Sequence, residues 1–443
     1  MRIDLRAPED HIKFLDGLRG AGAVLVYWHH QQHWAHRPAL AIYELAFGFH
    51  SRYHFITLPG VRILFNGGHY AAAVFFVISG YVLSTRPLDL ITSQRQGALA
   101  AYLSGALFRR WTRLYLPLIA TTFLYMTLWH VFGLQIRGAY PQDSWSQELR
   151  VWSREVKEFG FPFARLESPY LSYNSHLWSI PVEFKGSLVI YAVLLALSRS
   201  SRRARISCQL FLMLYFMYAV QDGWYLALFM SGMLLREIDV LENETHLYTI
   251  WNRPPTTAYI LSAALCCSLY LGGVPHCPDM DCVQINPGWK LLSRLVPRVE
   301  VAYDPKWHFL LPAATLLIFS VRRVPRLRSI FEHRSFQWLG RISFGIYLIH
   351  GPVMFVFADT LYMIVGWRDR GPPLHPSLNG LANFFPLPSS GPLGLEIGFI
   401  VPQIILGCLT LGLAELVTRA VIRPSVEFAS WLYLQTLATE KVE

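Results

Sequence analysis

Long apolar runs constrain the fold of this chain more than any other feature of its sequence. A helix needs about 20 apolar residues to cross a bilayer, and ten windows reach or approach that length. These candidate spans lie near 12–33, 61–84, 114–134, 176–197, 207–220, 222–236, 256–273, 308–321, 342–366 and 394–418. Because lipid offers no hydrogen bonds, each span must satisfy its own backbone groups. We therefore predict an all-α integral membrane protein, a polytopic bundle of about ten transmembrane helices.

The charge content agrees with a lipid-solvated surface. Only 15% of the 443 residues are charged, against about 25% in soluble domains. The formal net charge is +10, and basic residues gather between apolar runs, at 108–113, 198–205 and 322–328. That distribution is the positive-inside pattern of polytopic membrane proteins, and it makes the lipid bilayer a partner. Since no basic stripe with interleaved aromatic residues is present, we expect no nucleic-acid partner.

The same basic residues predict an orientation. With ten spans, the two termini and the even-numbered loops hold more Lys and Arg than the odd-numbered loops. We therefore expect both termini in the cytosol, with residues 419–443 as a cytosolic tail, and an endomembrane location. No internal repeat divides the chain, so we expect residues 1–443 to form a single membrane domain.

A polar loop with the sequence HCPDMDC, at 276–282, holds two of the six cysteines. If this loop faces an oxidising lumen, Cys277 and Cys282 are positioned to form a disulfide. A metal site that adds His276 and Asp279 is the alternative.

The first span carries ionisable residues, in LDGLRGAGAVLVYWHH at 15–30. Such groups cost about 2.5–3.5 kcal/mol each at membrane depth, so they usually face a cavity or a partner. At about 100° and 1.5 Å per residue, Arg19 and His30 share one helix face with Asp16 but lie about 16 Å apart along the axis. This spacing predicts a polar groove with His30 deep within it. Alternatively, Asp16 and Arg19 form an interfacial pair and the histidine is structural.

Two arginines precede the third span, in RRWTRLYLP at 109–117. Arg110 and Arg113 are i,i+3 neighbours on a helix. Two guanidinium groups on one face suit bidentate contacts with phosphates. A positive-inside anchor, which needs no ligand, is the other interpretation.

Further polar residues interrupt the fourth and ninth spans. In NSHLWSIPVEFKGSLVIY, at 174–191, Glu183 follows Pro181, which we expect to open a kink by removing a helix hydrogen bond. A buried carboxylate is costly without a partner, so Glu183 is either functional or paired with Arg or Lys. In RISFGIYLIHGPV, at 341–353, Tyr347 and His350 share one face. A structural role for that histidine stays open.

Taken together, these stretches resemble the membrane acyltransferase-3 family, in its fungal-type stand-alone branch. The start LDGLR, the pair Arg19-x10-His30, FFVISGYVLS at 75–84, Arg110-x2-Arg113, LWSIPVEF at 177–184 and ISFGIYLIHGPV at 342–353 match family motifs in order. The matches cover residues 12–353, most of the chain. The resemblance implies an O-acyltransferase that moves an acyl group from acyl-CoA to a hydroxyl group.

The resemblance also implies roles for single residues. His30 is expected to act as general base on the acceptor hydroxyl, with Glu183 orienting it or carrying a proton. The expected acyl-CoA contacts are Arg19, Arg110 and Arg113, and the expected substrate pocket contains Asp16, Trp178, Tyr347 and His350. We expect acetyl-CoA as co-substrate and no tightly bound cofactor or metal. The expected acceptor is a small hydrophobic molecule of fungal secondary metabolism.

The sequence leaves three alternatives. In the first, the acceptor hydroxyl belongs to a glycan or glycolipid. In the second, the groove serves a transporter or flippase, although the missing inverted repeat argues against that. In the third, histidines on facing helices bind a b-type haem, which predicts a Soret band.

Overall fold

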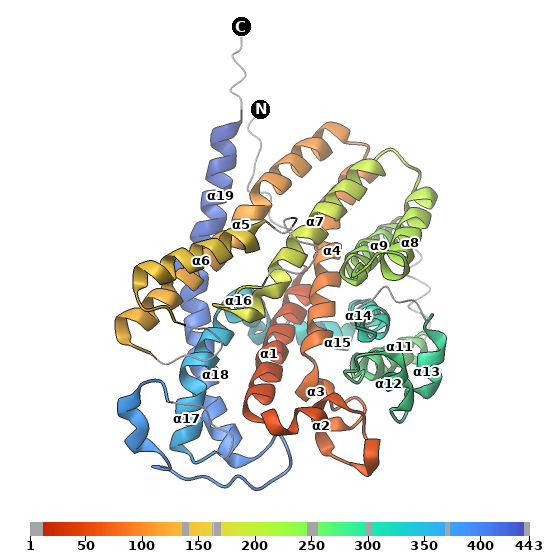
Figure 1. Cartoon of the computed structure of the whole chain (residues 1–443). Helices are drawn as coiled ribbons and strands as arrows, with labels where there is room; N and C mark the ends of the chain where they lie inside the picture. Colours follow the sequence, from red (N-terminus) through yellow and green to blue (C-terminus); the bar gives the residue numbers. More distant parts are fainter. Residues whose placement is uncertain are drawn as a thin grey trace. The chain divides into compact units, whose positions relative to one another are not determined.

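The computed structural model describes residues 12–134, 141–161, 163, 170–245, 256–297, 304–367 and 373–437. Every regular element within those ranges is a helix (Figure 1), which confirms the all-α prediction. The chain divides into two compact units. Unit 1 comprises Met1–Val24, His69–Ala101 and Val189–Arg341, and unit 2 comprises Leu25–Gly68, Tyr102–Leu188 and Ile342–Glu443.

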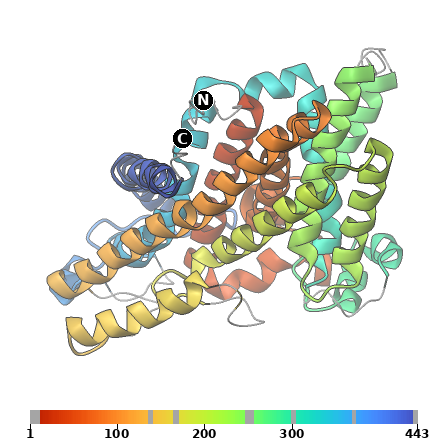
Figure 2. The same ribbon diagram turned by 90° about the horizontal axis from the view of Figure 1, so that it is seen from above.

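Unit 1 consists mainly of helices from the middle of the chain. Their bounds are α4 (Gly68–Thr92), α8 (Arg202–Tyr218), α9 (Trp224–Thr245), α11 (Thr256–Gly272), α12 (Met280–Ile285), α13 (Lys290–Leu295), α14 (Lys306–Arg323) and α15 (Pro325–Phe331). Helix α9 packs against α8 and α14, and α14 packs against α11. Figure 2 shows α8 beside α9. A disulfide joins Cys277, in the loop after α11, to Cys282 in α12.

Unit 2 combines short helices that follow α1 with long helices from the last quarter of the chain. Its elements are η1 (Arg37–Ala39), α2 (Leu40–Glu44), η2 (Phe49–Ser51), η3 (Phe55–Thr57), α3 (Ile63–Asn66), α6 (Trp145–Gly160), η4 (Ser175–Trp178), η5 (Met354–Ala358), α17 (Asp359–Ile364), η6 (Pro376–Leu381), α18 (Ile397–Val417), η7 (Thr418–Ile422) and α19 (Arg423–Thr436). Helix α4 belongs to unit 1 apart from its first residue, Gly68. Four further helices are shared between the two units: α1 (Lys13–Ala35), α5 (Gln96–Phe132), α7 (Ser179–Ala196) and α16 (Arg334–Val353).

Five helical segments are long and apolar enough to cross a bilayer. They are Gly68–Thr92, Gln96–Phe132, Ser175–Ala196, Arg334–Ile364 and Ile397–Thr436. The protein is therefore a membrane protein, but the predicted count of ten spans is not confirmed. The windows at 207–220, 222–236 and 308–321 do form helices. Those helices, α8, α9 and α14, include charged residues such as the RRAR start of α8, which lower their mean hydropathy.

Two boundaries differ from the sequence prediction. Helix α5 begins at Gln96 and not near 114, so Arg110 and Arg113 lie well inside a helix of 37 residues. Helix α7 begins at Ser179, which places Pro181 in its first turn. Proline is tolerated there because the first-turn N–H groups have no partner within the helix. The predicted kink at Pro181 was wrong, since this proline lies at the start of the helix.

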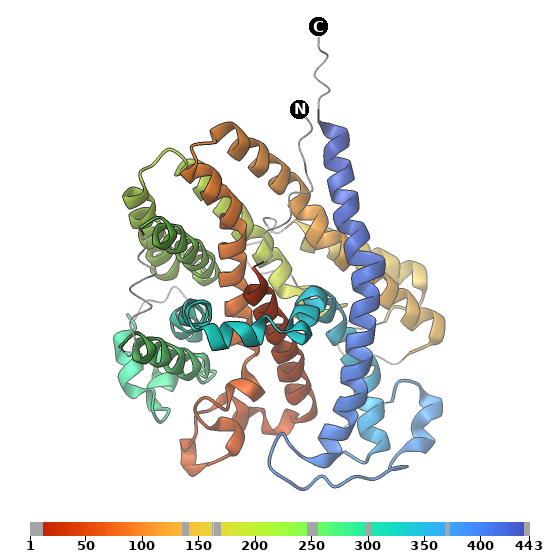
Figure 3. The ribbon, with the colours of Figure 1, turned by 180° about the vertical axis from the view of Figure 1, so that it is seen from behind.

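The end of the chain is helical further than predicted. Helix α18 continues through η7 into α19 without a break, as Figure 3 shows for the long terminal helix. The whole segment Ile397–Thr436 has 40 residues. Residues 419–436 of the predicted tail are thus helical, and residues 438–443 lie outside the described part of the chain.

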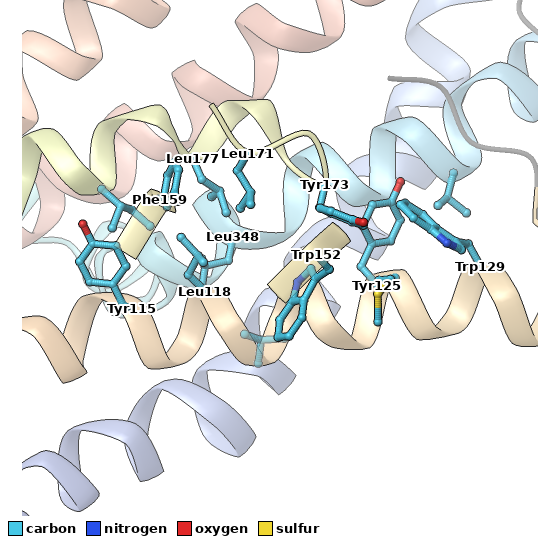
Figure 4. Packing of buried hydrophobic residues seen from close by; sticks show 14 residues of the cluster. Tyr115, Leu118, Tyr125, Trp129, Trp152, Phe159, Leu171, Tyr173, Leu177 and Leu348 are labelled. Atoms are coloured by element: carbon cyan, nitrogen blue, oxygen red, sulfur yellow. The ribbon is translucent and has the colours of Figure 1, made fainter. Parts of the chain in front are cut away.

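A large apolar cluster forms one core of unit 2 and draws on five parts of the chain (Figure 4). Helix α6 is amphipathic and is capped by Ser144, whose hydroxyl accepts from the Gln147 N–H at 3.3 Å. It turns its aromatic residues toward α5. The labelled members are Tyr115, Leu118, Tyr125, Trp129, Trp152, Phe159, Leu171, Tyr173, Leu177 and Leu348.

Close packing of α16 against α18 depends on a glycine. A Cβ at Gly345 would lie 2.5 Å from the Ala414 carbonyl oxygen and 2.7 Å from Thr418 Oγ1. We expect Gly345→Ala to destabilise the protein by about 1–3 kcal/mol, the usual cost of overpacking, and thermal unfolding in detergent measures this. Gly412→Ala on α18 is the control, because a Cβ there meets nothing within 4 Å. An unchanged melting temperature in Gly345→Ala would contradict the close packing.

Candidate active site

Three histidines from three different elements meet in unit 2. His30 comes from α1, His176 from η4 and His350 from α16. The ring centroids of His30 and His176 are 4.1 Å apart, those of His176 and His350 4.9 Å, and those of His30 and His350 5.3 Å. One ring nitrogen from each residue lies within 4.8 Å of the other two. The imidazoles thus converge on one point.

The hydrogen bonds of His350 fix the state of its ring. Nδ1 lies 2.9 Å from the Tyr347 carbonyl oxygen and 3.1 Å from the Ile346 carbonyl oxygen. Because carbonyl oxygens only accept, Nδ1 carries the hydrogen and Nε2 of the neutral ring carries a lone pair. His350 is only 1% exposed. Among the described residues, its Nε2 has no hydrogen-bond partner, nor has Nδ1 of His176.

The chain segment that carries His176 is held against α16. The Tyr347 hydroxyl donates to the His176 carbonyl oxygen at 2.6 Å, and it lies 2.7 Å from Ser179 Oγ. The Asn174 side chain donates to the Leu348 carbonyl oxygen at 3.1 Å. Leu177 directly follows His176, and Leu348 directly follows Tyr347. Both leucines lie in the apolar core shown in Figure 4. This packing fixes the backbone on both sides of the histidine cluster.

Gly351 allows this contact. An ideal Cβ on Gly351 would lie 2.7 Å from both His176 Nδ1 and Asn174 Oδ1. Any larger residue would therefore displace the side chain of His176. The glycine directly after His350 is needed because the two segments approach so closely.

A partly buried ion pair lies elsewhere in unit 2, between α5 and α7. Arg110 Nη2 is 2.5 Å from Glu183 Oε1, and Arg110 Nε donates to Ser187 Oγ at 3.0 Å. The two charged side chains are 15% and 19% exposed. Helices α5 and α7 run side by side in Figure 2. Arg113 lies one turn further along α5 and is half-buried.

The structure thus distributes the predicted site residues over separate groups. His30, His350 and Tyr347 come together, and Trp178 ends η4 two residues after His176. Glu183 contacts Arg110, which is the structural alternative raised by the sequence. Asp16 and Arg19 form an ion pair at 3.6 Å in unit 1.

Sequence reasoning missed His176 and Asn174. Both stand in NSHLWSIPVEF, four and two positions before the tryptophan of a stretch already singled out. Their signal was the polar run NSH at the start of an apolar span, where unpaired polar groups are costly. Nothing in the sequence pattern indicated that this run folds back onto α16.

Comparison with known proteins places this arrangement in a family. The family described as "Acyltransferase domain" matches residues 12–418. The chain is 29% identical to the O-acetyltransferase PaAT-1 of Phomopsis amygdali, over 97% of this chain and 86% of the relative. It is 24% identical to acyltransferase R4 of Phoma sp., over 82% and 88% of the two chains, and 25% identical to acyltransferase clz18 of Cochliobolus lunatus, over 74% and 75%.

No solved structure matches this chain significantly. The family match extends through both compact units and includes all three clustered histidines and the Arg110–Glu183 pair. The chain is therefore a membrane O-acyltransferase and belongs to the acyltransferase-3 family.

Proposed function

We propose that this enzyme transfers an acetyl group from acetyl-CoA to a hydroxyl group of a small hydrophobic acceptor. The observation that carries the proposal is the convergence of His30 and His176 on the buried His350. The printed name of one relative, an O-acetyltransferase, supports the acetyl group. The acceptor class, an alcohol of fungal secondary metabolism, rests on the resemblance to stand-alone fungal members of the family.

In the proposed reaction, His30 is the general base. An imidazole is largely uncharged near neutral pH and accepts a proton readily. His30 takes the proton of the acceptor hydroxyl while that oxygen attacks the thioester carbonyl carbon. The ester C–O bond forms, the C–S bond breaks, and the proton on His30 passes to the departing CoA sulfur. His350 and Tyr347 border the acceptor, and this sequence of steps uses no tightly bound cofactor.

The proposed donor contacts in unit 2 are Arg110 and Arg113. Their guanidinium groups suit the phosphates of acyl-CoA. Since Glu183 contacts Arg110, we assign Glu183 the role of a positioning residue that fixes this guanidinium. The assignments of Arg19 to acyl-CoA, and of Asp16 and Trp178 to the acceptor pocket, stay predictions.

We also propose an orientation, with both termini in the cytosol and an endomembrane location. The Cys277–Cys282 disulfide supports it, because disulfides persist in oxidising compartments such as the endoplasmic reticulum lumen. The predicted orientation places that loop on the lumenal side.

Purified full-length protein with labelled acetyl-CoA tests the function. We expect label to appear on polyketide or terpenoid alcohols, together with release of CoA. Label only on a glycan or glycolipid would replace the proposed acceptor class, and no transfer to any hydroxyl would refute the proposal.

The donor site has its own test in Arg113→Ala. Loss of a charge-assisted contact worth about 1.5–3 kcal/mol should raise the Michaelis constant for acetyl-CoA about 10- to 100-fold. Arg109→Gln is the matched control, because Arg109 lies on the same helix but contacts the ring of Tyr433 at 5.2 Å. Equal Michaelis constants for acetyl-CoA in the wild type and Arg113→Ala would contradict the donor contact and favour the membrane-anchor interpretation of this arginine.

A further inference from the structure

We propose that His30, His176 and His350 form an exchangeable binding site for a divalent cation of the Zn²⁺ class, and that the bound ion inhibits the enzyme. The binding site follows from geometry alone. The inhibition rests on the proposed function, because it requires His30 to be the proton acceptor.

The three nitrogens are close to the spacing that a metal ion requires. They lie within 4.8 Å of one another. In a tetrahedral zinc site with Zn–N bonds of about 2.0–2.1 Å, ligand nitrogens are about 3.3 Å apart. Rotations that bring the rings together by about 1.5 Å therefore complete three ligand positions. The fourth position stays open for water or another ligand.

The donor chemistry selects the class of ion. Nε2 of His350 carries a lone pair, is buried and has no hydrogen-bond partner among the described residues. Its Nδ1–H donates to the carbonyl oxygens of Ile346 and Tyr347, and metal-bound histidines use the same outer contact. Nδ1 of His176 is likewise buried without a partner in the described part of the chain. Imidazole ligands favour Zn²⁺, Cu²⁺ and Ni²⁺ over Mg²⁺ and Ca²⁺.

The same observations favour an exchangeable ion over a permanent one. Outer hydrogen bonds that orient a ligand strengthen metal binding about 10- to 100-fold each. Such a backbone contact is described for one of the three rings, that of His350. The rings are also too far apart for a closed site. Binding must therefore draw them together, which costs affinity.

Metal binding and base catalysis exclude each other at His30. A ring nitrogen whose lone pair coordinates an ion cannot accept a proton from the acceptor hydroxyl. The ion also takes the space that this hydroxyl needs. We expect inhibition that is competitive with the acceptor and not with acetyl-CoA.

Direct binding is tested on full-length protein without a polyhistidine tag, purified in detergent and treated with a chelator. Titration with Co²⁺, followed by visible d–d absorption, and displacement by Zn²⁺ should give one ion per chain. His350→Ala and His176→Ala should each weaken binding at least about 100-fold. His375→Ala is the control, because this exposed histidine bonds Ser377 and is not part of the three-histidine cluster. Equal binding by the wild type and both cluster variants would overturn the site.

The activity measurement tests the inhibition separately. Rising Zn²⁺ should reduce acetyl transfer in proportion to occupancy, and a chelator should restore it. Purified enzyme that already holds one zinc per chain and loses activity on its removal would overturn the inhibitory role. If no acetyl transfer occurs at all, the proposed function fails, whereas the Co²⁺ titration still decides whether the metal site exists.

Discussion

His30→Ala should lower the turnover number for acetyl transfer about 10²- to 10⁴-fold, the usual contribution of a positioned general base. The donor does not need this imidazole for binding, so the dissociation constant for acetyl-CoA should stay within about twofold. Steady-state rates with labelled acetyl-CoA, together with equilibrium binding of acetyl-CoA in the absence of acceptor, separate the two effects.

The matched control for this prediction is His33→Gln, one turn further along α1. Its Nε2 lies 2.9 Å from Asn66 Oδ1 and outside the three-histidine cluster. We expect His33→Gln to keep most of the wild-type rate, because glutamine can also bond the asparagine. If His30→Ala and His33→Gln lose activity equally while both stay folded, the general-base assignment is wrong.

Glu183→Leu should destabilise the protein by about 1–3 kcal/mol, because it leaves the partly buried Arg110 guanidinium without its counter-charge. Replacing both partners, as in Arg110→Met with Glu183→Leu, should recover most of that loss, since an apolar pair needs no desolvation of charge. The double variant should still show a raised Michaelis constant for acetyl-CoA. Thermal unfolding in detergent and initial-rate kinetics measure the two quantities.

Another ion pair, which is more exposed, provides the control. Arg328 Nε lies 2.7 Å from Glu332 Oε1, and the two side chains are 53% and 29% exposed. Glu332→Gln should cost less than about 1 kcal/mol, as is usual for exposed pairs. If the double variant of Arg110 and Glu183 has normal stability and a normal Michaelis constant for acetyl-CoA, the pair is not part of the donor site.

The sequence predicted the helical elements well because hydropathy reports directly on which segments avoid water. All ten windows coincide at least in part with helices of the structure. Helix ends were less predictable. Helix α5 begins 18 residues before its apolar window, which starts at 114, because a helix can extend beyond the apolar part of its sequence. The number of helices that cross the bilayer therefore does not follow from the windows alone.

The candidate site was predictable only in part, for a related reason. Spacing along one helix selects His30, since periodicity is a local property. The partners of His30 and Glu183 depend on contacts between segments far apart in the chain. His176 joins the cluster because the Tyr347 hydroxyl bonds its carbonyl oxygen and Gly351 leaves room for its ring. Neither contact has a signal in a single sequence.

The unbroken helix Ile397–Thr436 has a consequence for where the chain can be extended. Forty residues of helix rise about 60 Å, whereas the hydrocarbon core of a bilayer is about 30 Å thick. Roughly half of this helix must therefore lie in water or among lipid headgroups. The charged residues Arg419, Arg423 and Glu427 mark the half that leaves the lipid. A reporter protein joined after Thr436 would accordingly be carried on a stiff arm about 25 Å long.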